Sequence, residues 1–264
     1  LSTVASNRVL LLEAGGPDRN PFIHIPAGIA RLVRDPRIDW GYHTEPVPTL
    51  NGRRLWWPRG KVLGGSSSLN AMCYVRGQAE DYTAWDAVAP GWSYAAVLPY
   101  FRRSEDQERG ADHWHGTGGP LTVSNLRSPH PLSTVFIAAA AELGIAHNSD
   151  FNGAHQAGAG LYQVTQKNGR RASTAAAFLK ASRARPNLTV RTGALATRIR
   201  IDQGRATGVE YLHNDRRWCV SSGSVVLCGG AINSPHLLML SGIGPARVLE
   251  SVGIRVLEDL PGVG

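Results

Sequence analysis

Residues 59–70 read Arg-Gly-Lys-Val-Leu-Gly-Gly-Ser-Ser-Ser-Leu-Asn, and this stretch carries the most information about the fold. A short apolar step at Val62 and Leu63 leads into two glycines and three serines, and residues 69–75 then have helical character. Paired glycines let a backbone approach a ligand closely because no Cβ intervenes. A serine after them can cap the next helix, whose free N–H groups attract anions such as phosphate. The stretch predicts a phosphate-binding turn, with an ordinary Gly-Ser turn before a helix as the alternative.

A second glycine turn follows an apolar strand expected at residues 8–13, near the start of the chain. The strand ends in Glu13, and Gly15 and Gly16 follow it. In a dinucleotide-binding βαβ unit, an acid at the end of the second strand binds the ribose hydroxyls. Glu13 is therefore the candidate for ribose binding. An acid at the mouth of any parallel strand is the alternative.

The glycine-rich turn that normally accompanies such an acid does not occur in this sequence. A Gly-x-Gly-x-x-Gly turn should lie about 20 residues before the acid. Only twelve residues precede Glu13, and none of them is glycine. The later glycine pairs at 158–160 and 242–244 both lack the third glycine. We therefore expect the chain to begin inside the first helix of such a unit.

The remaining patterns predict mixed helices and strands. Residues 17–58 are rich in proline and aromatic residues, which favours an extended excursion with a hairpin turn at Asn51-Gly52. Helices are expected at 79–88, 94–104, 131–143, after the Ser-Thr pair at 173–174, at 234–240 and at 245–252. Strands are expected at 161–166, 188–191, 194–201, 206–212, 217–221, 224–228 and 255–257, and those from 188 to 221 should form a β-meander.

Composition sets outer limits on function. A content of 42% hydrophobic and 18% charged residues is typical of a globular protein, and no apolar run is long enough to span a membrane. The net charge of +8 comes from dispersed arginines, whereas a nucleic-acid binder shows a clustered basic face. The three cysteines are too few and too irregular for a disulfide framework. With no signal-peptide pattern, these features favour a cytoplasmic setting and no nucleic-acid partner.

Five stretches, taken in order, resemble the glucose–methanol–choline (GMC) family of FAD-dependent alcohol oxidoreductases, in particular its bacterial choline-dehydrogenase-like members. They are residues 13–16, 59–70, 115–121, 229–235 and 241–245. The resemblance implies an α/β fold, a partial Rossmann-like FAD-binding domain with a β-meander and inserted helical and loop segments. It implies that residues 1–264 form a single incomplete FAD-binding domain, with the C-terminal substrate domain and its active-site histidine absent.

The resemblance also implies which residues contact FAD. Glu13 would bind the adenosine ribose, and Ala196 stands where a valine usually touches adenine. The other implied contacts are Val62, Gly65 and Ser66 along the cofactor, Asn70, Ala71, Met72 and Cys73 against the isoalloxazine, and Gly230 and Ala231 beside it.

No catalytic base can be carried over from the resemblance. His113, His115 and His236 do not match the family's active-site positions, and we assign them to loop and helix positions. The His-x-His pair at 113–115 has no third ligand in sequence, so no metal site is expected.

The implied activity is oxidation of a primary alcohol, choline-like or other, to an aldehyde by hydride transfer to flavin N5. The electron acceptor would be oxygen or a quinone. The alternative is a catalytically inert FAD-domain fragment, because both the pyrophosphate loop and the histidine-bearing domain are missing from the sequence. An opened sheet edge would also make such a fragment poorly soluble. A serine hydrolase is disfavoured, since no Gly-x-Ser-x-Gly occurs.

Overall fold

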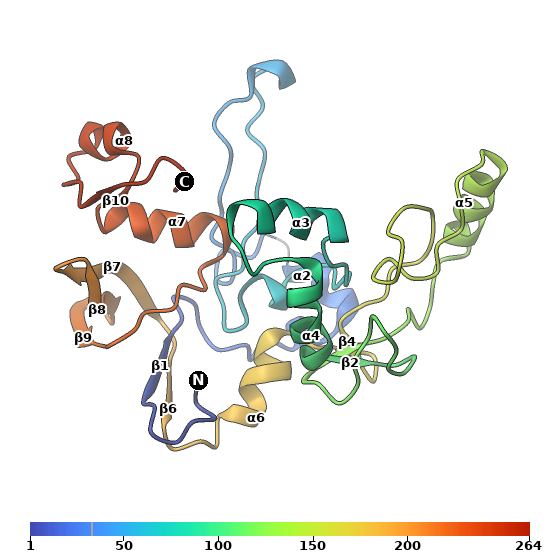
Figure 1. Ribbon diagram of the computed structural model, residues 1–264, viewed down its shortest axis with the longest axis horizontal. Helices are drawn as coiled ribbons and strands as arrows, with labels where there is room; N and C mark the ends of the chain where they lie inside the picture. Colours follow the sequence, from blue (N-terminus) through green and yellow to red (C-terminus); the bar gives the residue numbers. More distant parts are fainter. Residues whose placement is uncertain (33) are drawn as a thin grey trace. The chain divides into compact units, whose positions relative to one another are not determined.

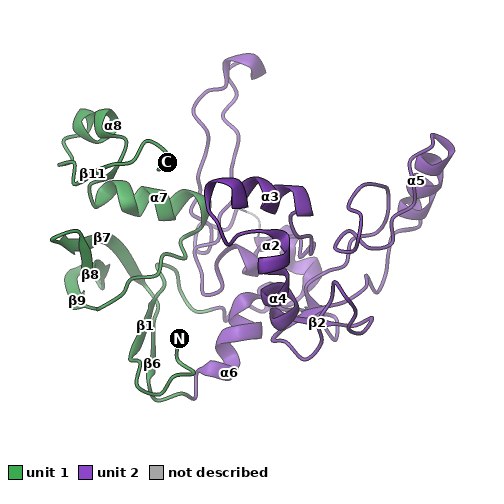
Figure 2. Ribbon diagram, in the orientation of Figure 1, with its two compact units in different colours: residues 1–17, 185–264 green, residues 18–184 purple. Residues whose placement is uncertain are grey.

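A computed structural model describes residues 1–32 and 34–264 of the chain (Figure 1). The described chain falls into two compact units, coloured separately in Figure 2. Unit 1 comprises residues 1–17 and 185–264, and unit 2 comprises residues 18–184. Helices and small sheets occur in both, as the predicted α/β class requires. Within the described ranges, no helix has the length and apolar character needed to cross a bilayer.

Unit 1 is built on a parallel strand pair and an antiparallel meander. Strand β1 (Val9–Leu12) pairs in parallel with β6 (Leu188–Arg191), and the sequence predicts a strand at both places, although not their pairing. The meander joins β7 (Ala194–Asp202), β8 (Arg205–His213) and β9 (Arg216–Ser221) in that order. Its two tight turns place residues 203–204 and 214–215 at positive φ, the backbone that matches the twist of a hairpin. The predicted meander is confirmed for its last three strands, but residues 188–191, which the sequence analysis placed in it, pair with β1 instead.

The end of unit 1 differs from the sequence prediction in two places. Residues 224–228 belong to no strand, and Val226 is 64% exposed. An apolar run becomes a strand only when a neighbouring strand takes its N–H and C=O groups, and no described segment does so here. The last strand falls at β11 (Glu258–Asp259) rather than 255–257, because Gly242 accepts the N–H groups of Leu257 and Glu258 and so sets the register. The other elements are α7 (Gly230–Leu240), β10 (Ile243–Gly244) and α8 (Ala246–Ser251).

Unit 2 has a small apolar core near its start. Ile23, Leu32, Ile38 and Val62 are buried together, and Leu69 packs against them. This core anchors the predicted excursion, which is a long two-armed loop bridged at 39–60, 43–56 and 47–53. Asn51 and Gly52 at its tip both have positive φ, so the predicted turn is confirmed. The short helices here are α1 (Pro21–His24), η1 (Pro26–Gly28), α2 (Ile29–Leu32) and η2 (Pro48–Leu50).

The helical patterns of unit 2 are found where the sequence predicts them, with one exception. Helices α3 (Ala79–Val88), α4 (Tyr94–Ser104) and α5 (Pro131–Glu142) form as expected. Residues 69–75 are not helical: η3 (Gly65–Ser68) is one 3₁₀ turn, and it is followed by a turn and irregular backbone with an isolated bridge at Cys73. The remaining elements are β2 (Glu105–Gln107), β3 (Leu121–Val123), β4 (Gln166–Lys167), β5 (Arg170–Arg171), η4 (Ala175–Leu179) and α6 (Lys180–Ser182).

Candidate functional site

The glycine–serine stretch of unit 2 forms a tight turn stabilised by its own hydroxyl groups. Gly64 and Gly65 have φ values of 92° and 55°, a backbone that favours glycine. The Ser67 and Ser68 hydroxyls donate to the carbonyl oxygens of Gly64 and Leu63 at 2.6 and 2.9 Å. The predicted serine cap on a following helix is therefore wrong, because the serines bind the turn itself. A four-residue 3₁₀ turn provides no helix N-terminus for an anion.

Two candidate contacts in this turn have different surroundings. Ser66 is exposed, and its Oγ accepts the Gly60 N–H at 3.1 Å. A Cβ on Gly65 would meet nothing within 4 Å, so open space lies beside it. The Val62 side chain is fully buried in the apolar core, which leaves only its backbone for any contact with a ligand.

After the turn, residues 71–73 alternate between exposed and buried positions. The Asn70 Oδ1 accepts the Met72 N–H at 3.1 Å, a local turn that competes with helix formation. Met72 has φ 64°, and its buried side chain accepts a hydrogen bond from Gln166 Nε2 at 3.7 Å. Ala71 and Cys73, on either side of it, are exposed. This reversal explains why the predicted helix does not form.

Cys73 is the edge residue of a small bridged layer. It lies opposite Val164, and Val164 lies opposite Ser124. The bonds of the first bridge are made by its neighbours, because the Met72 carbonyl accepts from Thr165 and the Tyr74 N–H donates to Gln163. In such a bridge the N–H and C=O of Cys73 itself face the opposite side.

The backbone at 71 and 73 therefore offers hydrogen-bond donors to a ligand. Among residues 1–32 and 34–264, no protein acceptor binds the N–H of Ala71 or of Cys73. Both residues are exposed, and two N–H groups separated by one residue suit a planar ligand that carries acceptor atoms along one edge.

Arg171 holds this segment from the buried side. Its Nε donates to the Ile23 carbonyl at 2.8 Å. Its Nη1 donates to the Ser67 carbonyl at 3.1 Å, the Asn70 carbonyl at 2.7 Å and the Asn70 Oδ1 at 2.9 Å. Thr174 adds to the clamp, because its N–H donates to Ser67 Oγ at 2.9 Å. The turn and residues 70–73 are thus fixed by a strand and helix start about a hundred residues further along the chain.

The candidate residues of unit 1 occupy two strand regions and one helix start. Glu13 follows β1, and its Oε1 accepts the Gly15 N–H at 2.7 Å. Ala196 lies on β7 opposite Tyr211, next to a register shift in the ladder. Gly230 and Ala231 are exposed at the start of the 11-residue helix α7, and Gly230 has φ 82°. An exposed helix start carries free N–H groups that favour negative charge.

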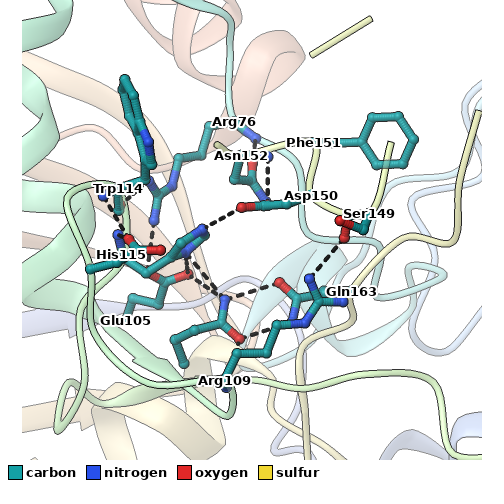
Figure 3. Close-up of polar contacts among 12 residues, drawn as sticks. Arg76, Glu105, Arg109, Trp114, His115, Ser149, Asp150, Phe151, Asn152 and Gln163 are labelled. Atoms are coloured by element: carbon teal, nitrogen blue, oxygen red, sulfur yellow. Dashed lines mark hydrogen bonds and ion pairs between the residues drawn. The ribbon is translucent and has the colours of Figure 1, made fainter. Parts of the chain in front are cut away.

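A second polar cluster, which the sequence did not reveal, surrounds His115 (Figure 3). Glu105 is fully buried and accepts from Arg76 Nη2 at 2.8 Å, from His115 Nδ1 at 3.1 Å and from the Gly116 N–H at 3.0 Å. The other imidazole nitrogen, Nε2, lies 2.9 Å from Asp150 Oδ2. We name Arg76, Glu105, His115 and Asp150 the buried ion cluster.

The two carboxylates keep His115 protonated at neutral pH. Hydrogen bonds to Asp150 and Glu105 raise the pKa of His115 from 6.5 to about 9, although burial opposes the change. The same bond to His115 lowers the pKa of Asp150. An imidazole that is buried, protonated and bonded at both nitrogens is unsuited to accept a proton from a substrate. The cluster is therefore structural, and its only sequence sign, the His-x-His pair, does not indicate the distant carboxylates.

His113 lies apart from this cluster and is exposed. Across the described part of the chain, no three His, Cys, Asp or Glu side chains come together in a way that would hold a metal ion. His236 is exposed on α7. All three histidines thus occupy the loop and helix positions assigned from the sequence.

Comparison with known proteins identifies the family. The family model described as GMC oxidoreductase matches residues 21–264, and the chain belongs to this family. The chain is 48% identical to an alcohol dehydrogenase [acceptor] of Pseudomonas putida and 48% identical to an oxygen-dependent choline dehydrogenase of Rhizobium etli. Each alignment covers 100% of this chain but 49% and 48% of the relative. The chain thus spans about half the length of the curated relatives it matches.

The chain is also similar to solved structures of oxidoreductases. A pyridoxine 4-oxidase from Mesorbium loti superposes with a TM-score of 0.92 at 38% identity, over 99% of this chain and 52% of the other. An FAD-dependent oxidoreductase from Chaetomium thermophilum superposes with a TM-score of 0.89 at 30% identity, over 100% of this chain and 48% of the other.

The described residues fit a flavin cofactor. A flavin ring is planar and carries several acceptor atoms on its edge, which the exposed N–H groups of Ala71 and Cys73 can bind. The open space beside Gly65 admits close approach of a ligand to the backbone.

Proposed function

We propose that the chain binds FAD and that the whole protein oxidises a primary alcohol, choline-like or other, to an aldehyde with flavin N5 as the hydride acceptor. Membership of the GMC family supports the reaction class. The observation that carries the cofactor proposal is the pair of N–H donors on the exposed residues 71 and 73, which no described protein acceptor binds and which Arg171 holds in place. The acceptor of the electrons would be oxygen or a quinone.

Each candidate residue has a proposed role in holding the cofactor. The backbone of residues 70–73 binds and orients the ring, with Asn70 shaping the turn and Met72 anchored below it. Gly65 and Ser66 line the approach to the ring, together with the backbone of Val62. Glu13 binds ribose, Ala196 contacts adenine through its backbone, and Gly230 and Ala231 offer N–H groups at a helix start. When bound, FAD supplies the two-electron acceptor, and the protein orients the alcohol carbon against it.

The base that removes the hydroxyl proton is not assigned to this chain. His115 is bonded to two carboxylates and buried, so it cannot reach a substrate. This observation favours the second candidate function for residues 1–264 alone, a catalytically inert FAD-domain fragment. We also propose the cytoplasmic setting that the cysteine content predicts.

Anaerobic mixing of the flavin-loaded protein with choline, and separately with simple primary alcohols, tests the proposal. We expect the visible absorption of the flavin to bleach with at least one alcohol. A whole protein that carries FAD and is bleached by none of them contradicts the proposed reaction. Bleaching by the 264-residue chain alone would overturn the second candidate.

A further inference from the structure

Arg171 is a buried cation that is paired with no carboxylate among the described residues. Its residue exposure is 3%, and in the described part of the chain no carboxylate lies within ion-pair distance of it. The Nη2 atom is buried and has no hydrogen-bond partner. Burial lowers the pKa of the Arg171 guanidinium, and no charged neighbour acts in the opposite direction. Because a buried, unpaired charge is costly, this arginine differs from Arg76, which is paired with Glu105.

The Arg171 charge is coupled directly to the candidate flavin segment. Two of its bonds end on Asn70, one on the carbonyl and one on Oδ1, and that Oδ1 also accepts the Met72 N–H. Donation to the Asn70 carbonyl polarises the peptide unit that contains the Ala71 N–H, which strengthens this N–H as a donor. The charge therefore acts on the Ala71 N–H through one peptide bond. Inside a protein it is also screened less than in water.

We propose that Arg171 is a positioning residue that raises the reduction potential of a flavin bound at residues 70–73. The inference rests on the proposed cofactor function. Reduction adds electrons to the flavin, and a fixed positive charge behind the segment stabilises the electron-rich form more than the oxidised form. The uncompensated burial of Arg171 is then explained, because a neighbouring carboxylate would cancel the field. A neutral residue could support the turn but could not supply this charge.

The test compares four forms of the whole, FAD-loaded protein: unaltered, R171M, R171K and the control R170M. Arg170 is the preceding residue on β5 and is exposed, so its removal changes net charge equally without touching the segment. The readout is the midpoint reduction potential of the bound flavin, with the melting temperature measured in parallel.

We expect R171M to weaken binding of reduced flavin about tenfold relative to oxidised flavin. For a two-electron couple, this corresponds to a fall of about 30 mV in the midpoint reduction potential of the bound flavin. R171K retains the charge and should keep a potential close to that of the unaltered protein, although it loses the fork of bonds to Asn70. R170M should change nothing. If R171M does not retain flavin, R171Q provides the same neutral comparison, because its amide can still donate to the Asn70 carbonyl.

Two results would overturn the inference while leaving the cofactor proposal intact. One is an unchanged potential in the neutral variants despite a lower melting temperature, which would make Arg171 a purely structural support. The other is an equal fall of the flavin reduction potential in R171M and R171K, which would show that the positive charge of Arg171 does not set this potential. An unaltered protein that takes up no FAD refutes the proposed function instead, and the inference with it.

Discussion

At the scale of single residues, Glu105 is a buried carboxylate bonded to two cationic side chains. It is fully buried and accepts hydrogen bonds from Arg76, His115 and the Gly116 N–H. We expect E105Q to lower the free energy of unfolding by about 3–5 kcal/mol, because it leaves buried cations without their carboxylate. Urea denaturation followed by circular dichroism measures this loss.

The neighbouring residue provides the control for E105Q. Asp106 is on the same strand, and its Oδ1 accepts the exposed Gly118 N–H at 3.0 Å. D106N should therefore cost about 1 kcal/mol or less. Equal losses in the two variants would show that the buried ion cluster contributes no special stability.

His115 should make stability depend on alkaline pH. The pKa of its imidazole is about 9 in the folded protein, against an ordinary value of 6.5, so the folded state binds the proton more tightly than the unfolded chain does. This contribution, on the order of 3 kcal/mol, is complete below pH 6.5 and is lost as the pH rises through about 9. Melting temperatures measured across this range should fall in the unaltered protein and fall less in H115Q. H113Q, at an exposed position, is the control, and its melting temperature should fall with pH as steeply as that of the unaltered protein.

At the scale of elements, helix α5 exposes an apolar surface. Leu132, Val135 and Phe136 are 67%, 61% and 72% exposed, and Leu143 just beyond the helix is 83% exposed. Exposed apolar clusters of this kind promote association. We expect F136E to raise the solubility of the 264-residue chain and to change its melting temperature little. Static light scattering against protein concentration measures association and solubility, and a thermal melt measures the melting temperature.

A buried position on the same helix provides the contrast for F136E. Ala140 is only 7% exposed, so A140E places a charge where water does not reach and should destabilise the fold. A destabilisation by F136E as large as that by A140E would mean that the Phe136 face packs against protein after all.

At the scale of the whole molecule, FAD should stabilise the protein by mass action. A ligand that binds only the folded state adds about 2.7 kcal/mol at a hundredfold excess over its dissociation constant. We expect FAD added to apoprotein to raise the melting temperature more than NAD does, since NAD shares the adenosine and pyrophosphate but lacks the flavin ring. Equal shifts with FAD and NAD would count against ring binding at residues 70–73.

Much of the secondary structure could be predicted from local pattern. Residues 79–88, 94–104 and 188–191 form elements with the bounds that the sequence predicts. Local periodicity succeeds there because each segment satisfies its own helix bonds or pairs with a similarly apolar strand. It fails at residues 69–75, where the left-handed backbone of Met72 and the pairing of Cys73 with Val164 replace a helix. That pairing depends on residues far along the chain.

In the candidate site, too, local features could be predicted from the sequence, whereas contacts between distant residues could not. The glycine pair indicates a close-approach turn from composition alone, because only the backbone is involved. Arg171 could not be found in this way, since its bonds to Asn70 join residues 101 positions apart. The carboxylates around His115 were likewise invisible, because Asp150 is 35 positions from the imidazole it binds. Whether the predicted contacts bind FAD stays a prediction that the cofactor experiments test.

The outward-facing donors at positions 71 and 73 also have an evolutionary consequence. They belong to the main chain, so a codon change at either position to any residue except proline alters a side chain but leaves the N–H in place. These two positions can drift while the recognition pattern persists. Changes at Asn70, Met72 or Arg171 act differently, because they alter the scaffold that aims the donors. Selection for binding would therefore act on residues that support the contact, and natural variation should be freest at the contact itself.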